Sequence, residues 1–195
     1  RIKQWLSGGE APPSAAQTRI LMVCTGNICR SPTAERLAAL HAHQMNVADF
    51  TASSAGTHAV IGHAIHPRAA AELMELGGDP SGFAARQLTP KIASGADLIV
   101  TMTRAHRDEV LELAPSKLRR TFTLFEVSRL ITEKNVRAVA DLATLRAHIG
   151  HSELVDIPDP IGHGVDAFSA VGAQIAALIP PILGLFQASY DAAND

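Results

Sequence analysis

The 195-residue chain lacks the disulfide framework, the basic block and the metal-ligand spacing that mark several classes of protein. Its only cysteines, Cys24 and Cys29, are too few and too close for the disulfide framework of a small secreted domain, so we expect a cytoplasmic protein. With 17 Lys and Arg against 19 Asp and Glu, and no sustained basic block, we expect neither nucleic acid nor a membrane surface as a partner. The nine histidines form no metal-ligand spacing with the cysteines, so we expect no metal and no cofactor.

The two ends of the chain differ in composition. The first 18 residues contain no long apolar stretch and turn rich in Gly, Pro, Ser and Ala, which predicts a flexible tail over 1–18 and one domain over 19–190. Near the other end, VDAFSAVGAQIAALIPPILGLFQASY is apolar enough to suggest a membrane span, but its glutamines and paired prolines weaken that interpretation. Its apolar residues recur at helical spacing, which favours a buried, kinked helix.

Between these ends, strand-like and helix-like segments alternate. The predicted strands are ILMVC (20–24), DFTASSAGT (49–57), ADLIVTM (96–102) and RTFTLFEV (120–127). PTAERLAALHAHQM, HPRAAAELMELGG and RAHRDEVLELAP have helical spacing, with Pro32 and Pro67 suited to first helical positions. This alternation predicts βαβ units, and therefore an α/β fold with a parallel sheet and helices on both faces. Residues 129–155 are predicted to be a helical insertion.

The stretch VCTGNICRSP (23–32) joins the first predicted strand to the first predicted helix. In such folds ligands bind at the carboxyl ends of the strands, and unpaired N–H groups at a helix start attract anions. Gly26 and Asn27 tolerate the unusual dihedrals that let a short loop curl with its amides inward. The loop therefore predicts a cradle for a tetrahedral oxyanion.

Cys24 and Arg30 stand at the two ends of this loop. A helix start and a neighbouring arginine favour the thiolate form of cysteine, which is a far better nucleophile than the thiol. Arg30 can hold two phosphate oxygens through its planar fork, and Ser31 can donate its hydroxyl to the thiolate. The alternative is that Cys24 is a small buried residue and Arg30 a surface residue, which the joint pattern disfavours.

A phosphate ester also needs a proton donor for its leaving oxygen, and the loop contains no carboxylate. VDIPDPIGHG offers Asp156 and Asp159 in a Pro- and Gly-rich segment of the kind that projects side chains over a site. On these grounds alone the two aspartates are nearly equal candidates.

VCTGNICRSPTAE is similar, nearly position for position, to the signature loop of low-molecular-weight protein tyrosine phosphatases, and it also resembles the loop of the related arsenate reductases. SSAGT, HPRA, ARQLT, ADLIVTM and DP follow in the family's order. The resemblance implies a four-stranded parallel sheet, Cys24 as the nucleophile and Asp159 as the general acid. The phosphate-binding residues that it implies are Thr25, Gly26, Asn27, Ile28, Cys29, Arg30 and Ser31.

Some positions depart from the family pattern. Members that act on phosphotyrosine usually carry aromatic residues after the Asp-Pro pair, where this chain has Ile161, so the aromatic wall for the substrate ring is missing. Phe83 replaces a histidine that often braces the loop asparagine in eukaryotic members. Ile28 resembles the phosphotyrosine type, since arginine phosphatases of the family carry threonine there. By the resemblance, His63 and Ile161 are candidate walls of the pocket.

The resemblance thus implies a phosphomonoester hydrolase that works through a phosphocysteine on Cys24. Protein phosphotyrosine is the leading substrate, and a small phosphomonoester is the other. One alternative is arsenate reduction with an external small thiol, since the chain lacks further cysteines for a thioredoxin-linked relay. Another is a non-hydrolytic phosphate carrier or phosphopeptide-binding module, against which Arg30 and Asp159 together argue. The sequence does not indicate an oligomeric state.

Hydrolysis does not require the second thiol, Cys29. A thiolate at Cys24 is the group most exposed to peroxide, and relatives with both cysteines pair them in a disulfide. The resemblance therefore implies reversible oxidation to a Cys24–Cys29 disulfide. The alternative is that Cys29 only packs its side chain under the loop.

Overall fold

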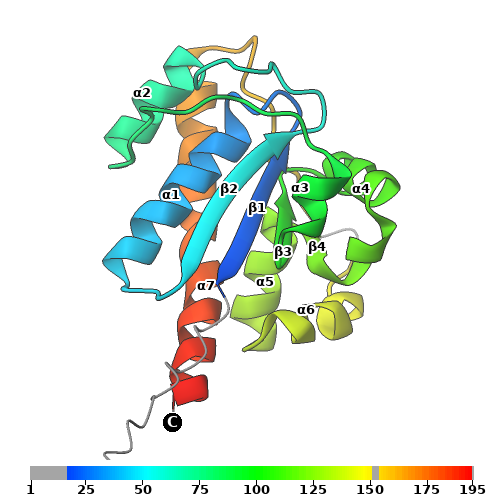
Figure 1. Cartoon of the computed structure of the whole chain (residues 1–195). Coiled ribbons are helices and arrows are strands. Elements are labelled where there is room, and N and C mark those ends of the chain that lie inside the picture. The colour runs from blue at the N-terminus through cyan, green and yellow to red at the C-terminus, as the bar shows by residue number, and fades with distance from the viewer. Residues whose placement is uncertain (1–16, 151–153, 195) are drawn as a thin grey trace, which may run out of the picture.

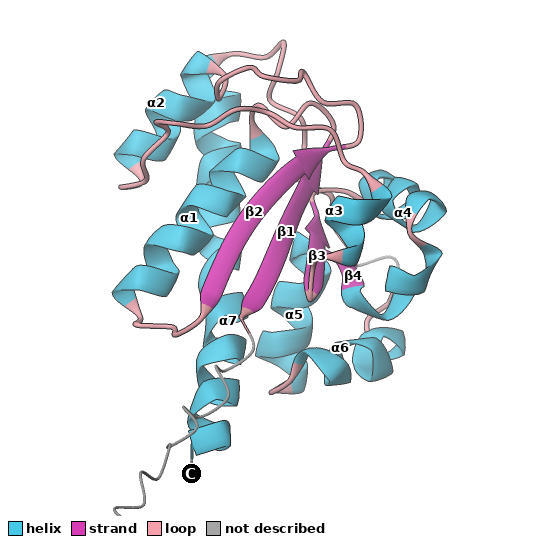
Figure 2. Cartoon of the chain, viewed as in Figure 1, coloured by secondary structure: helices cyan, strands magenta, loops and turns pink. Residues whose placement is uncertain are grey.

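Residues 17–150 and 154–194 are described by a computed structural model, in which four parallel strands lie in the order β2-β1-β3-β4 (Figure 1, Figure 2). The strands are β1 (Thr18–Cys24), β2 (Phe50–Gly56), β3 (Leu98–Thr101) and β4 (Thr121–Thr123). The α-helices are α1 (Arg30–Gln44), α2 (Pro67–Glu75), α3 (Pro90–Ser94), α4 (Arg104–Leu113), α5 (Leu124–Lys134), α6 (Val139–Leu145) and α7 (Val165–Asn194). The 3-10 turns are η1 (Pro115–Arg120) and η2 (Arg146–His148). Most of the predicted tail, residues 1–16, lies outside the described residues.

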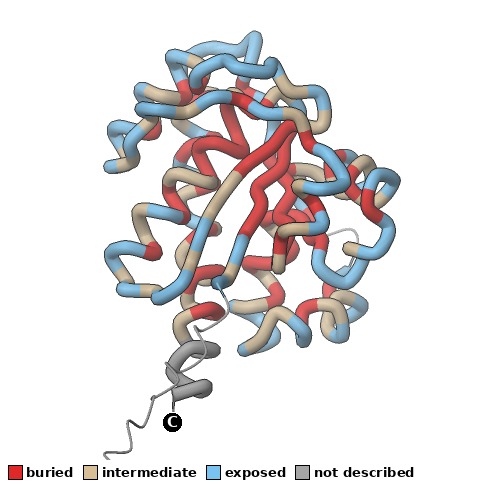
Figure 3. The backbone as a smooth tube through the Cα atoms, viewed as in Figure 1, coloured by how far each residue is buried: buried red, intermediate tan, exposed pale blue. Residues whose placement is uncertain are grey.

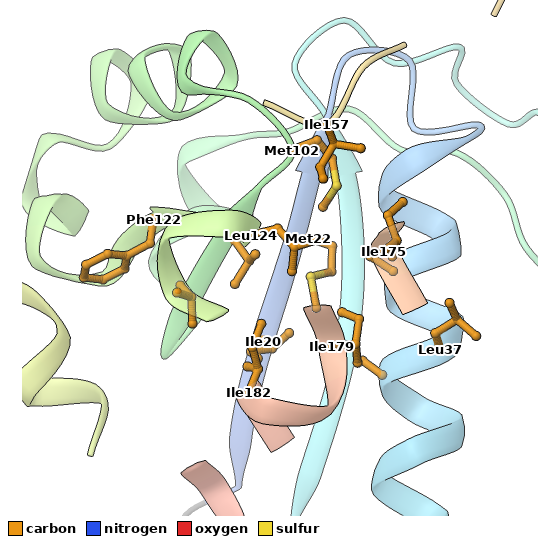
Figure 4. Packing of buried hydrophobic residues seen from close by; sticks show 14 of the residues in the cluster. Ile20, Met22, Leu37, Met102, Phe122, Leu124, Ile157, Ile175, Ile179 and Ile182 are labelled. Carbon is orange, nitrogen blue, oxygen red and sulfur yellow. The ribbon is translucent and has the colours of Figure 1, made fainter. Parts of the chain in front are cut away.

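The central strand β1 is buried on both faces because its side chains alternate between two apolar clusters. Ile20 and Met22 pack with residues of α1, α5 and α7, and Figure 4 shows Ile179 beside them. Leu21 and Val23 pack on the other face with residues of α3 and α4. Figure 3 shows the buried backbone concentrated along β1 and the inner sides of the helices. The predicted parallel sheet with helices on both faces is therefore confirmed.

The predicted strand RTFTLFEV is wrong in its second half, because β4 ends at Thr123 and α5 begins with the next residue. Thr123 Oγ1 accepts the N–H of Glu126 at 3.1 Å, and Glu126 Oε2 accepts the N–H of Thr123 at 3.2 Å. This reciprocal capping box starts a helix and outweighs the strand propensity of the residues that follow. The segment 129–155 contains the end of α5, all of α6 and η2, and its status as an insertion stays a prediction.

The apolar segment near the end of the chain forms α7, which packs as the predicted core helix. Phe168, Val171 and Ile175 are each at most 4% exposed and belong to the same cluster as residues of α1 and α5. By length and composition alone, Val165–Gln187 would also suffice to cross a membrane. Figure 1 shows α7 running along one face of the sheet beside α1, and the helix continues through its paired prolines.

The carboxyl ends of the strands meet at one edge of the sheet, and several loops gather there (Figure 2). These are the loop after β1, the loop 57–66 after β2 and the segment 154–164 before α7. The N–H of Ile157 donates to the carbonyl of Met102 at 2.9 Å and so ties the last of these segments to the end of β3. Sequence-distant residues therefore come together at this edge.

Candidate active site

The loop from Thr25 to Cys29 leads from β1 directly into α1. The helix begins at Arg30, so Pro32 is its third residue and not its first, as we expected from the sequence. Cys29 occupies the N-cap without a side-chain cap, and within the described part of the chain the N–H groups of residues 25–30 donate to no protein acceptor. Free N–H groups and the positive end of α1 therefore converge on this loop, as anion binding requires.

The loop 57–66 turns the carbonyl groups of this first loop outward. Four carbonyl oxygens accept its N–H groups over 2.6–3.0 Å: Cys24 from Thr57, Thr25 from His58, Gly26 from Val60 and Ile28 from His66. The carbonyl and the N–H of one planar peptide point in opposite directions. Each outward carbonyl therefore directs the next N–H inward, and the predicted anion cradle is formed by contacts from a distant segment.

The two loops approach closely because position 56 is glycine. A Cβ on Gly56 would collide with the carbonyl oxygen of Thr25. The loop 57–66 is held in turn by Gln87, whose Oε1 accepts the N–H of Ala59 at 2.9 Å and whose Nε2 donates to the carbonyl of Thr57 at 2.7 Å. The motif ARQLT thus supports the cradle from outside.

Cys24 is the last residue of β1, directly before the loop, and is 2% exposed. Its Sγ is 2.9 Å from the Oγ of Ser31. Ser31 Oγ also accepts an N–H from Asn27 Nδ2 at 2.9 Å, which leaves the serine proton free to point at sulfur. The structure thus brings Ser31 to Cys24 in the geometry that hydroxyl donation to a thiolate requires.

Cys29 is a second free thiol in this loop and is buried like Cys24. Burial raises the pKa of Cys29 to about 12, with the nearby Cys24 acting in the same direction. At neutral pH Cys29 is therefore a protonated thiol and not a competing nucleophile.

The unusual dihedral of the loop lies at Asn27, with φ 55°, whereas Gly26 does not adopt a positive φ. The expectation for Gly26 is therefore wrong, because only one residue of the loop has to turn through the left-handed region. Asparagine is among the few residues that adopt it readily.

Asn27 is completely buried, and all of its amide contacts are made without the histidine that Phe83 replaces. Besides Ser31, its Nδ2 donates to Ser54 Oγ at 2.8 Å, and its Oδ1 accepts the N–H of Arg86 at 2.9 Å. Ser54 Oγ donates to Glu35 Oε2 at 2.5 Å, and burial raises the pKa of that carboxyl. Hydrogen bonds therefore run from α1 through β2 to the nucleophile.

Arg30 connects the cradle to the segment before α7. Its side chain is 6% exposed, its Nη1 donates to the carbonyl of Ile157 at 3.0 Å, and its Nη2 donates to Asp159 Oδ2 at 3.0 Å. The Asp159 side chain is 49% exposed, so solvent or a leaving group can reach its carboxyl. Asp156 instead accepts the N–H of Arg104 at 2.9 Å and caps α4 from outside. The structure thus brings Asp159, and not Asp156, to Arg30.

His106 is a site residue that the sequence analysis missed. It lies in the first turn of α4, is 4% exposed, and its Nε2 is 2.8 Å from Thr25 Oγ1. Burial, followed by the charge of Arg30, lowers the pKa of His106 to about 4, so the ring is neutral at pH 7. The only signal in the sequence is its place just after a strand end, which is where such folds collect site residues.

The two candidate wall residues are both exposed, and their role as walls of the pocket stays a prediction. His63 is exposed, and its backbone contacts Val60 and Ala85 and not the cradle. From the same loop, the side chain of Val60 lies next to Gly26 of the cradle. Ile161 is 42% exposed, and its N–H donates to Asp159 Oδ1 at 3.1 Å. No group of three or more His, Cys, Asp or Glu among the described residues is placed to hold a metal ion.

The sequence of residues 19–137 matches the family described as low molecular weight phosphotyrosine protein phosphatase. Low molecular weight protein-tyrosine-phosphatase Wzb of Escherichia coli K12 is 40% identical over 96 residues, which cover 49% of this chain and 62% of that protein. The chain thus spans less than two thirds of this relative's length. A putative low molecular weight protein-tyrosine-phosphatase of Klebsiella pneumoniae is 32% identical over 153 residues, or 78% of this chain and 85% of that protein.

Solved structures share the fold. Wzb of Vibrio vulnificus in complex with benzylphosphonate is 26% identical, with a TM-score of 0.66 over 86% of this chain and 98% of that one. YwlE arginine phosphatase of Geobacillus stearothermophilus is 25% identical, with a TM-score of 0.67 over 91% of this chain and 94% of that one. These likenesses support the α/β fold described above.

Proposed function

Since the chain belongs to the low molecular weight phosphotyrosine protein phosphatase family, we propose that it hydrolyses phosphomonoesters through a phosphocysteine intermediate on Cys24. The observation that carries this proposal is the cradle itself. A buried thiol at Cys24, loop N–H groups without a protein acceptor and a buried arginine at the start of α1 are the groups that binding a tetrahedral anion needs, and they support this proposal.

In the first step, Cys24 attacks phosphorus while the loop N–H groups and Arg30 hold the non-bridging oxygens. Ser31 stabilises the thiolate before attack and the departing thiolate later. A bound phosphate competes with Asp159 for the Arg30 guanidinium, which frees the carboxyl to carry a proton. Asp159 gives that proton to the leaving oxygen.

In the second step, water hydrolyses the phosphocysteine. The Asp159 carboxylate, now ionised, takes a proton from the attacking water, and Cys24 leaves as a thiolate. Inorganic phosphate is released, and Asp159 is again protonated for the next cycle. His106 stays neutral throughout and holds the hydroxyl of Thr25, the residue next to the nucleophile.

Protein phosphotyrosine is the substrate that we propose first. The relatives aligned at 40% and 32% identity are named protein-tyrosine phosphatases, and Ile28 has the phosphotyrosine-type identity. The exposed Ile161 provides no aromatic wall, so we expect a weaker preference for aryl over alkyl phosphates than in relatives that have one. A cytoplasmic location is also proposed, which the two free thiols support.

A panel of substrates tests this proposal. With peptides of one sequence, we expect kcat/KM for phosphotyrosine to exceed that for phosphoarginine by at least about tenfold, and no arsenate reduction with glutathione. Cys24→Ser protein, purified in parallel, controls for contaminating phosphatases. Preference for phosphoarginine would contradict the proposed substrate, and arsenate turnover without ester hydrolysis would replace the proposed reaction.

We further propose that the loop is redox-sensitive. Peroxide converts the Cys24 thiolate to a sulfenic acid. The sulfur of Cys29 then attacks that of Cys24, and its thiol proton goes to the departing hydroxide, so that a disulfide forms and water is released. We expect dithiothreitol to restore most of the activity of oxidised parent protein but little of the activity of oxidised Cys29→Ser protein. Peptide mass mapping and re-assay after reduction measure this.

The untreated Cys29→Ser protein is the control for this experiment, since hydrolysis does not require Cys29. Full recovery of the oxidised variant, or no Cys24–Cys29 linked peptide in the oxidised parent, would leave Cys29 with a packing role only.

A further inference from the structure

The start of α2 lies between the phosphate cradle and the segment that carries Asp159. The backbone N–H of His66 donates to Ile28 of the cradle at 2.6 Å. Two residues further along, the Nη1 of Arg68 donates to the carbonyl of His163 at 3.0 Å. One short piece of chain therefore contacts both parts of the proposed catalytic apparatus.

This piece of chain is itself held in place. The ring of His66 stacks on Phe168 of α7 with centroids 5.0 Å apart, and its Nδ1 accepts the N–H of Arg68 as the cap of α2. The guanidinium of Arg68 lies 5.9 Å from the centroid of the same Phe168 ring. Because Phe168 is 4% exposed, these contacts tie the start of α2 to the core.

Within the segment 158–164, Pro160 is buried and the other residues are exposed. The start of the segment is anchored, since Ile157 is buried and bonded to Met102 and to Arg30. Its far end is exposed, and a hollow of about 230 Å³ lies between it and α7, lined among others by Pro158, Asp159 and His163. Pro160 therefore anchors the backbone on one side of the turn, whereas the exposed residues after it are held by hydrogen bonds.

We propose that Arg68 is a positioning residue for the general acid, holding the far end of the Asp159 segment in register with the cradle. This inference rests on the proposed role of Asp159. Two hydrogen bonds join the turn at His163 to Asp159. The N–H of His163 donates to the carbonyl of Pro160 at 3.0 Å, and the N–H of Ile161 donates to Oδ1 of Asp159. A shift of the His163 carbonyl is thereby passed to the carboxyl over a few bonds. Since proton transfer needs close, aligned contact, a small displacement lowers its rate.

The test uses a series of substituted phenyl phosphates, from 2,4-dinitrophenyl to unsubstituted phenyl. Arg68→Met keeps most of the aliphatic stem over Phe168 and removes the donors to His163. We expect it to lower kcat/KM about tenfold for phenyl phosphate and less than about twofold for 2,4-dinitrophenyl phosphate, since only the poor leaving group needs the acid. Arg68→Lys, which retains a donor, should keep most of the parent's kcat/KM for phenyl phosphate.

Two further variants separate this inference from the proposed function. In Asp159→Ala, kcat/KM should depend more steeply on the leaving group than in the parent protein. The double variant with Arg68→Met should have the same kcat/KM as Asp159→Ala, because Arg68 acts through Asp159. Arg19→Met is the control, since its ion pair with Asp97 lies at the start of β1, away from the site, and its rates should match the parent.

The outcomes are distinct. If Asp159→Ala shows no leaving-group dependence, the proposed acid is wrong. If Asp159→Ala shows this dependence, three results for Arg68→Met would contradict its positioning role. These are an equal loss of kcat/KM for all substrates, no loss for any substrate, and a loss that adds to that of Asp159→Ala. Melting temperatures close to the parent's are expected for Arg68→Met, because this side chain is exposed.

Discussion

Replacing Cys24 by serine is expected to lower phosphatase turnover by about 10⁴-fold or more, because a serine hydroxyl in this loop has no adjacent base to activate it. The cradle should survive, since its N–H groups are oriented by the loop 57–66 and its guanidinium by Ile157 and Asp159, none of which depends on sulfur. Initial rates with an aryl phosphate measure turnover, and calorimetric titration with vanadate measures anion binding by the cradle.

Cys29→Ser is the matched control for Cys24→Ser, because it makes the same change of atom in the same loop. It should keep most of the parent's turnover before any oxidation. If Cys24→Ser protein hydrolysed substrate at an undiminished rate, a phosphocysteine intermediate on Cys24 would be excluded. If it lost both turnover and vanadate binding, the cradle would depend on the thiol in a way that the hydrogen bonds do not indicate.

Asp159→Ala is expected to lower kcat/KM for phenyl phosphate by about 10²- to 10³-fold, which is within the usual contribution of general acid catalysis. The effect should be far smaller for 2,4-dinitrophenyl phosphate, because its leaving group departs without a proton. The carboxyl is half-exposed and contacts Arg30 at the rim of the cradle, where a leaving oxygen would lie. Steady-state kinetics across the phenyl phosphate series measures this dependence.

The control for Asp159→Ala is Asp156→Ala. Asp156 lies three residues away and is bonded to Arg104 at the start of α4, so its loss should affect stability more than the leaving-group dependence. The opposite result, with the steep dependence in Asp156→Ala and none in Asp159→Ala, would show that the wrong carboxylate has been assigned.

The local patterns of the sequence were sufficient for much of the fold. The continuous apolar run before Cys24 predicted a strand buried on both faces, and Ile20 to Val23 do alternate between two clusters. The pattern failed in RTFTLFEV, because the Thr123–Glu126 capping box is a specific pair of hydrogen bonds that apolar spacing does not report. Helix α1 also started earlier than Pro32, since the loop curls directly into it.

The sequence by itself determined the alternation of strands and helices and the placement of Cys24, Gly26, Asn27 and Arg30 in one short loop, because these depend on near neighbours in the chain. Only the tertiary structure showed that Asp159 is the carboxyl that contacts Arg30, and that His106 contacts the hydroxyl of Thr25. It also decided how the loop asparagine is braced when Phe83 stands in place of the family's histidine. These partners come from segments 27 to 129 residues away, and their meeting depends on how the parallel strands bring their carboxyl ends to one edge. Such contacts have no spacing in the sequence from which they can be predicted.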